Sequence, residues 1–358
     1  MSLKFIYVVR HGFRSSWSVD NAGNYTAHLR SPTGLPTDPA LTSHGVEQAN
    51  DLAEHLLGIK PPIELVYSSP YYRCLQTISP FVTKHNALRR QKSTLTGSST
   101  QNSPLGIRAE AGLSEWYGRA HFDHPTSAPL SDLCNLFGDV DASYVSLPGP
   151  RRKGESIPQL YERVAACLRS IIARSDQEEK QSVVICTHAA VVIVLGRLLT
   201  GQIPADPNEE DFRAFTCGLS IYRRQDVRTN ASNNDGNDTA TVFDRQEHGS
   251  SSEPIIRSRL DFPTSHRNDR RALDSDATGS RTPSWRCGIN MSSSWTCEAN
   301  STCNFLSGGE ERGWRFSGDE SFIDFSEEGL LSSDIEPDAQ AAGHDDENSI
   351  GVCTSYKL

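Results

Sequence analysis

The stretch Phe5-Ile-Tyr-Val-Val-Arg10-His11-Gly12 decides the fold. Its first five residues are apolar and mostly β-branched or aromatic, which is typical of a buried parallel strand. An arginine, a histidine and a glycine follow at once. Open α/β sheets bind ligands at the carboxyl ends of their strands, so this pattern brings a reactive side chain to that edge. Three such residues recur often by chance, so the tripeptide alone favours an ordinary solvated strand end. A functional site requires matching parts from the rest of the chain.

The bulk composition excludes several classes of protein. The 358 residues suffice for one or two domains, but a hydrophobic content of 36% is low for a wholly globular chain. A net charge of −10 disfavours non-specific binding of nucleic acid or anionic membrane. No run of 18 apolar residues predicts a membrane span, and the N-terminus lacks a hydrophobic signal core. We therefore expect an intracellular protein, cytoplasmic, nuclear or both.

The nine cysteines form an odd set without the close pairs of a zinc site. Three of them, Cys74, Cys167 and Cys186, lie inside apolar segments and are interpreted as small buried hydrophobes. Cys287, Cys297 and Cys303 come nearest to a cluster, and metal binding there stays open as a minor alternative. The prediction is that the protein holds no metal and no cofactor.

From Leu3 to about Arg223, strand and helix signals alternate, as a parallel α/β sheet requires. Three of the expected helices are preceded by residues suited to cap them, which are Thr42 or Ser43, Ser69 and Ser156. Two long polar loops interrupt this order, at residues 13–39 and 119–153. Expected strands cover residues 3–9, 64–67, 106–112, 182–187 and 216–222. Expected helices begin at 42–43, 71, 156 and 189. The second of these helices is expected to end near Lys84, and a polar insertion over 86–104 follows it.

The composition changes sharply after Gln225, which predicts four parts of the chain. Residues 1–225 form the α/β domain. Residues 226–280 are rich in Asn, Asp, Ser, Arg and Thr without a sustained period, which predicts a disordered insertion. Residues 281–325 carry too many aromatic side chains for pure disorder and are expected to dock on the core, and 326–358 form an acidic disordered tail.

Five residues predict the chemistry of the sheet edge. His11 and His188 each follow a buried-type strand, Arg10 accompanies the first, and Arg73 stands in the first turn of a helix, where an anion is favoured. Glu115 follows a further strand. Arginine forks bind phosphate in a bidentate manner, a neutral imidazole can attack phosphorus, and a carboxylic acid can protonate a leaving alcohol. The set therefore favours phosphoryl transfer.

In this order, Arg10-His11-Gly12, Arg73, Glu115 and His188 resemble the histidine phosphatase (phosphoglycerate mutase-like) superfamily. Two more segments agree with it, Leu41-Thr-Ser-His-Gly45-Val-Glu-Gln48-Ala49 and Ser68-Ser-Pro-Tyr-Tyr-Arg73-Cys-Leu-Gln76-Thr77. The resemblance covers roughly residues 3–223. It implies a three-layer α/β sandwich around a mainly parallel sheet.

The same resemblance implies a role for each residue. His11 would be the nucleophile that becomes a phosphohistidine, without a metal, and Glu115 the proton donor. Arg10 and Arg73 would clamp the phosphate, and His188 would stabilise charge on the transferring group. For each of them an ordinary structural role remains the competing interpretation, most strongly for Glu115.

Arg14 and Phe13 set this chain apart within the superfamily. Arg14 matches a position where one branch and the related ubiquitin-associated phosphatases carry an additional arginine, which would also bind substrate. Phosphoglycerate mutases carry Glu where this chain has Phe13. The resemblance therefore implies hydrolysis of a phosphorylated small molecule or phosphopeptide, with mutase activity disfavoured.

A narrower resemblance is visible in Arg10-His-Gly-Phe-Arg-Ser-Ser-Trp17, Gly112-Leu-Ser-Glu-Trp-Tyr117 and Val184-Ile-Cys-Thr-His-Ala-Ala190. These segments resemble a fungal branch that includes the phosphatase-like tau subunit of the RNA polymerase III transcription factor TFIIIC. The branch implies transcription-factor subunits as partners. A weakly active or non-catalytic assembly role is therefore the alternative to phosphatase activity.

Overall fold

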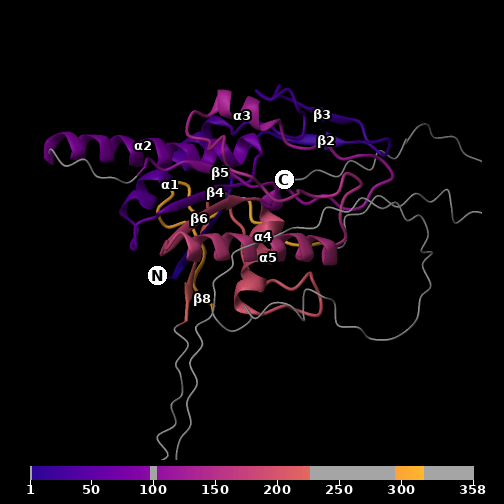
Figure 1. The fold of residues 1–358 in the computed structure, drawn as a ribbon. Helices are drawn as coiled ribbons and strands as arrows, with labels where there is room; N and C mark the ends of the chain where they lie inside the picture. Colours follow the sequence, from indigo (N-terminus) through magenta and orange to yellow (C-terminus); the bar gives the residue numbers. More distant parts are fainter. Residues whose placement is uncertain (1, 97–102, 226–294, 318–358) are drawn as a thin grey trace, which may run out of the picture. The chain divides into compact units, whose positions relative to one another are not determined.

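A computed structural model describes residues 2–96, 103–225 and 295–317. These residues form one compact unit around a six-stranded sheet with the strand order β5-β4-β6-β1-β7-β8 (Figure 1). A separate two-stranded sheet pairs β2 (Trp17–Val19) with β3 (Tyr25–Ala27). The predicted insertion at 226–280 and the predicted tail at 326–358 lie outside the described residues.

Four neighbouring strands of the large sheet are parallel. Arg10 at the end of β1 stands opposite Thr187 at the end of β6, and β4 pairs in parallel with both β6 and β5. Their carboxyl ends therefore meet at one edge, as the sequence predicted. The bounds are β1 (Phe5–Arg10), β4 (Leu65–Ser68), β5 (Ile107–Ala109) and β6 (Ser182–Thr187).

The chain direction reverses at each of the other two strands, so that only the first of them runs opposite to β1. β7 (Leu219–Arg224) pairs antiparallel with β1, and β8 (Trp295–Thr302) pairs antiparallel with β7. The last predicted core strand thus lies in the sheet but starts later and is antiparallel, which its apolar pattern did not reveal. β8 comes from the aromatic-rich segment, and the described residues after it also lie against this sheet.

Helices cover both faces of the sheet, so the architecture is the predicted three-layer sandwich. α1 and α2 lie on one side, and α4 and α5 on the other (Figure 1). Side chains of β1 alternate between the layers: Ile6 and Val8 pack with α4 and α5, whereas Tyr7 and Val9 pack with α1 and α2. The helices are α1 (Ser43–Gly58), α2 (Tyr72–Thr96), α3 (Leu130–Leu136), α4 (Ile157–Gln177) and α5 (Ala189–Thr200).

Local signals explain where several helices begin and end. The Thr42 hydroxyl accepts from the Gly45 amide at the start of α1, and Ser156 forms a full capping box with Gln159 at the start of α4. Gly201 ends α5 in the left-handed conformation, with φ of 71°. Among the described residues, no helix has both the length and the apolar character needed to cross a bilayer.

Two sequence predictions about local structure were wrong. α2 does not end near Lys84 but continues to Thr96, because its polar second half still consists largely of good helix formers such as Leu88 and Arg89. The long loops also contain structure of their own: the β2–β3 hairpin lies within residues 13–39, and α3 lies within 119–153. Neither element shows a clear period in sequence.

Candidate active site

His11 is the first residue after β1 and is nearly fully buried. Its amide donates to the Thr187 carbonyl at 2.9 Å, which ties the end of β1 to the end of β6. Its ring nitrogen Nδ1 lies 2.8 Å from the Gly12 carbonyl oxygen. A carbonyl can only accept, so Nδ1 carries the proton, and Nε2 of the neutral ring is left with a free lone pair. That is the form a nucleophilic histidine needs.

Burial is the main reason that the pKa of His11 lies well below its ordinary value. The guanidiniums of Arg73 and Arg10 lower it further, followed by His188 and Arg14. A ring in this environment stays neutral at neutral pH. The same cationic surroundings would stabilise a phosphate dianion placed beside Nε2.

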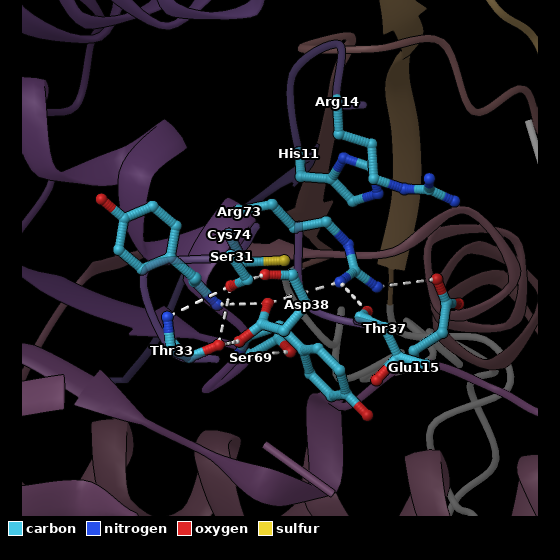
Figure 2. Close-up of polar contacts among 12 residues, drawn as sticks. His11, Arg14, Ser31, Thr33, Thr37, Asp38, Ser69, Arg73, Cys74 and Glu115 are labelled. Carbon is cyan, nitrogen blue, oxygen red and sulfur yellow. Dashed lines mark hydrogen bonds and ion pairs between the residues drawn. The ribbon is translucent and has the colours of Figure 1, made fainter. Parts of the chain in front are cut away.

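Arg73 lies at the centre of the polar cluster and is completely buried (Figure 2). One amino group, Nη2, donates to the Glu115 carboxylate at 3.2 Å, and the other, Nη1, donates to the Thr37 carbonyl at 3.0 Å. Burial opposes the charge of Arg73, but Glu115 and further negative partners outweigh it and raise its pKa. Its Nε is buried without a hydrogen-bond partner among the described residues. Arg73 thus has one guanidinium N–H that no described residue accepts.

Asp38 is a site residue that the sequence did not single out. It lies beside Arg73 (Figure 2). Its carboxylate is 3.5 Å from Arg73 Nη1 and accepts from the Tyr72 amide at 2.7 Å. Burial raises its pKa to about 6, against the opposing effect of Arg73. Asp38 therefore holds the anion position at the N-terminus of α2, where Ser69 was predicted as the cap.

His188 caps α5 by position, directly after β6, and has no exposed surface. Its Nε2 lies 2.7 Å from the Ser69 hydroxyl, and its Nδ1 lies 3.3 Å from Glu115 and 3.2 Å from Arg73. Burial lowers the pKa of His188, but Cys74 and Glu115 outweigh burial and raise it overall. A protonated Nδ1 pairs with Glu115, whereas an unprotonated one accepts from Arg73.

The loop after the short 3₁₀ helix η1 (Ala111–Leu113) places Glu115 between Arg73 and His188. Its second carboxylate oxygen accepts from the Trp116 amide at 3.1 Å. Arg163 of α4 fixes the loop by donating to the carbonyls of Gly112 and Ser114 at 2.9 and 3.0 Å. Arg163 thus positions the loop that carries Glu115. From the sequence, Arg163 could be recognised only as a residue on the polar side of a predicted helix.

Arg10 and Arg14 line a pocket of about 390 Å³ that opens beside His11. Arg10 is buried and donates to the Ala214 carbonyl at 2.7 Å, and burial lowers its pKa to about 10. Arg14 donates to the Ser15 carbonyl at 2.9 Å, its guanidinium lies 5.8 Å from the centre of the Trp17 ring, and burial lowers its pKa to about 9. Both arginines also line a small cavity together with Glu115.

All six residues singled out in the sequence lie in one place. The ligand atoms of His11, Glu115 and His188 all lie within 4.8 Å of one another. Such a triad has the donor set of a metal site. It also lies among the guanidiniums of Arg10, Arg14 and Arg73, which would repel a divalent cation and attract an anion.

Comparison with known proteins identifies the class that this fold and site define. The model of the histidine phosphatase superfamily (branch 1) matches residues 6–234, so the chain belongs to that superfamily. It is 30% identical over 230 residues to the transcription factor tau 55 kDa subunit of Saccharomyces cerevisiae, a match that covers 62% of this chain. It is also 30% identical over 227 residues, or 57% of this chain, to the ecdysteroid-phosphate phosphatase of Drosophila melanogaster.

The chain matches only part of these relatives. The matches cover 48% of the yeast subunit and 28% of the Drosophila phosphatase. Among solved structures, the ecdysone phosphate phosphatase from Bombix mori in complex with tungstate is 19% identical with a TM-score of 0.44, covering 62% of this chain and 89% of that one.

Proposed function

We propose that the protein is a metal-independent phosphatase that hydrolyses a phosphate monoester through a phosphohistidine on His11. The observation that carries the proposal is the buried, neutral imidazole whose Nδ1 is tied to the Gly12 carbonyl. This leaves Nε2 as a nucleophile among cations. Membership of the histidine phosphatase superfamily and the similarity to a named phosphatase support the same reaction class.

The first step would transfer the phosphoryl group to the enzyme. Nε2 of His11 attacks phosphorus, the new N–P bond forms, and the bond from phosphorus to the ester oxygen breaks. Protonated Glu115 gives its proton to the departing oxygen. Arg10 and Arg73 bind the non-bridging oxygens, and His188 stabilises the charge that they carry in the transition state.

The second step would regenerate the enzyme. Glu115, now a carboxylate, takes a proton from a water molecule while the oxygen of that water attacks phosphorus. The N–P bond breaks and its electron pair returns to Nε2 of His11, with inorganic phosphate as the product. A carboxylate oxygen of Glu115 lies within 4.8 Å of a ring nitrogen of His11, which supports its part in both steps.

Hydrolysis of p-nitrophenyl phosphate tests this function directly. We expect turnover by the wild-type protein and its loss in His11→Ala, with wild-type activity unchanged by a chelator. His85→Ala is a suitable control, since His85 belongs to α2 and contacts Phe81 rather than the site. Equal rates for wild type and His11→Ala would contradict the nucleophilic role, and a loss on adding chelator would contradict the metal-free reaction.

A role as an assembly subunit is the second candidate function. It is favoured by the 30% identity to the transcription factor tau 55 kDa subunit, and it implies transcription-factor subunits as partners and a nuclear location. Affinity purification of the tagged full chain from its native cells tests it. Co-purification of RNA polymerase III transcription-factor subunits with an inactive protein would favour assembly, whereas an active protein without them would favour the phosphatase.

Phosphoglycerate mutase activity is the least favoured reaction. One relative, the phosphoglycerate mutase-like protein 1 of Arabidopsis thaliana, is 25% identical over 217 residues. Phe13 brings an apolar ring beside His11, where the mutase resemblance requires Glu, and its ring lies under the Arg312 guanidinium. We expect no isomerisation of 3-phosphoglycerate, and measurable isomerisation would overturn this expectation.

A further inference from the structure

A segment far along the chain completes the wall of the pocket beside His11. We call residues 303–317, which follow β8, the strap. The strap crosses the carboxyl end of the sheet, and two of its residues reach the site: Arg312 lines the pocket together with His11 and Arg14, and Trp314 lines a small cavity together with Glu115. A segment nearly 200 residues beyond Glu115 therefore shapes the site.

The strap is held in place by contacts on both sides of Arg312. The Glu311 carboxylate accepts from His44 at 2.7 Å and from Gln48 at 3.0 Å, and its carbonyl accepts from the Thr216 amide at 3.1 Å. Further on, Phe316 is buried against Trp116. These contacts fix the position of Arg312 relative to α1 and to the loop of Glu115.

Arg312 contributes to the site through both its backbone and its side chain. Its carbonyl accepts a hydrogen bond from Arg10, which orients a proposed phosphate clamp. Its φ is 51°, a conformation that is unfavourable for residues other than glycine and that the strap contacts must maintain. Its guanidinium lies 4.6 Å from the centre of the Phe13 ring.

The Arg312 side chain is exposed at the mouth of the pocket. Among the described residues it makes no ion pair with a carboxylate, although Glu311 next to it pairs with His44. The same mouth is lined by Phe13 and Leu29, which are apolar, and by Arg14. The entrance thus combines an apolar wall with the guanidiniums of Arg14 and Arg312, and of these two only Arg14 also lines the cavity beside Glu115.

We propose that Arg312 is a specificity-determining residue that binds a second anionic group of the substrate, beyond the phosphate that is transferred. The inference rests on the proposed phosphatase function and names its substrate class: phosphate monoesters with an apolar or aromatic body and a carboxylate at its far end. The apolar part of the substrate lies along Phe13 and Leu29, and its carboxylate pairs with the Arg312 guanidinium.

A matched pair of substrates tests this specificity. 4-Carboxyphenyl phosphate and its methyl ester have nearly the same shape and differ by one charge. We expect the wild-type protein to hydrolyse the carboxylate with a kcat/KM about tenfold above that of the ester, the lower end for a hydrogen bond to a charged group. In Arg312→Gln the ratio falls to about one through KM, and in Arg312→Lys part of it returns. An unchanged ratio in an active Arg312→Gln would overturn the inference.

A control variant separates the side chain from the fold of the strap. Arg315 lies on the same strap but points to solvent, where it pairs with exposed Glu210. Arg315→Gln should keep the wild-type ratio and activity. Because the substitution at Arg312 leaves its carbonyl in place, Arg10 keeps its hydrogen bond, and hydrolysis of the methyl ester should change little. A ratio that falls equally in both variants would contradict a specific role for Arg312.

A binding measurement keeps this inference separate from the proposed function. 4-Carboxybenzylphosphonate and its methyl ester cannot be hydrolysed, so calorimetric titration reports their Kd values whether or not the protein turns over. An inactive protein that binds the carboxylate about tenfold more tightly, with the preference lost in Arg312→Gln, would refute the phosphatase and support the inference. An active protein without that preference would support the phosphatase function and refute the inference about Arg312.

Discussion

Asp38 and Arg73 form an ion pair that has no exposed surface on either side chain, with Oδ1 of Asp38 3.5 Å from Nη1 of Arg73. The same oxygen accepts from the Tyr72 amide at 2.7 Å and so caps α2. One carboxylate therefore fixes both the start of the helix and the orientation of the arginine proposed to bind phosphate. Breaking a buried pair leaves a charge uncompensated, but here Glu115 remains as a second partner of Arg73.

We expect Asp38→Asn to change how stability depends on pH. Burial raises the pKa of Asp38 to about 6 in the folded protein, from 3.8, so the folded state binds the Asp38 proton more tightly than the unfolded state. Its contribution to stability is full below pH 4 and is lost as the pH rises to about 6, by an amount on the order of 3 kcal/mol. Urea unfolding of wild type and variant between pH 4 and 7 measures the difference.

The wild type should therefore lose stability relative to Asp38→Asn over this interval. A constant difference between the two proteins would contradict the raised pKa. The variant should also lose between about 10- and 100-fold in kcat/KM, because Arg73 is less firmly oriented. Thr33→Val is a control from the same loop, since the Thr33 hydroxyl is a more distant partner of Asp38 at 3.4 Å.

The sequence predicted the sheet, its helices and the convergence of His11 and His188, because strands that are buried on both faces have a strong apolar pattern. It also located Thr42 and Ser156 as caps, since capping acts within a few residues. These are local signals, and local chemistry explains them.

The sequence did not predict what depends on distant partners. Asp38 lies in a loop without a period, and its pairing with Arg73 exists only once the loop folds over α2. The orientation of β7 depends on the path of the chain and not on side-chain alternation. Arg312 joins the site because β8 adds to the sheet edge after a long intervening stretch, a contact that local pattern does not encode.

We expect the His11 ring to stay neutral at pH 6. Burial and the guanidiniums of Arg73 and Arg10 lower its pKa, so only the unfolded chain takes up a proton there as the pH falls through 6.5. The contribution of His11 to stability is thus full above pH 6.5 and declines below it. NMR of ¹⁵N-histidine protein, with His11 assigned through His11→Ala, should show the Nδ1-protonated neutral ring. A titration midpoint near that of free imidazole would refute it.

The two glycines at the ends of α1 should respond oppositely to alanine. A Cβ at Gly45 would lie 1.9 Å from the Phe13 carbonyl oxygen, which accepts from the Thr42 amide. Gly45→Ala should therefore destabilise the protein by at least about 1–3 kcal/mol and lower kcat/KM, because the displaced loop follows His11. At Gly58 a Cβ meets nothing within 4 Å, so Gly58→Ala should be neutral or stabilising by up to about 1 kcal/mol. Urea unfolding compares them, and equal effects would contradict the steric explanation.

The strap should contribute to the stability of the whole unit through Phe316. Its ring is buried, packs against Trp116 at 5.4 Å between ring centres, and lies under the Arg197 guanidinium. Truncating a buried phenylalanine costs about 3–5 kcal/mol, so Phe316→Ala should lower the free energy of unfolding by that amount. Trp116 directly follows Glu115, and we therefore expect kcat/KM for p-nitrophenyl phosphate to fall as well. Arg315→Ala, one residue away and exposed, should cost less than about 1 kcal/mol. If both variants unfold at the wild-type urea concentration, the strap is not part of the cooperative fold.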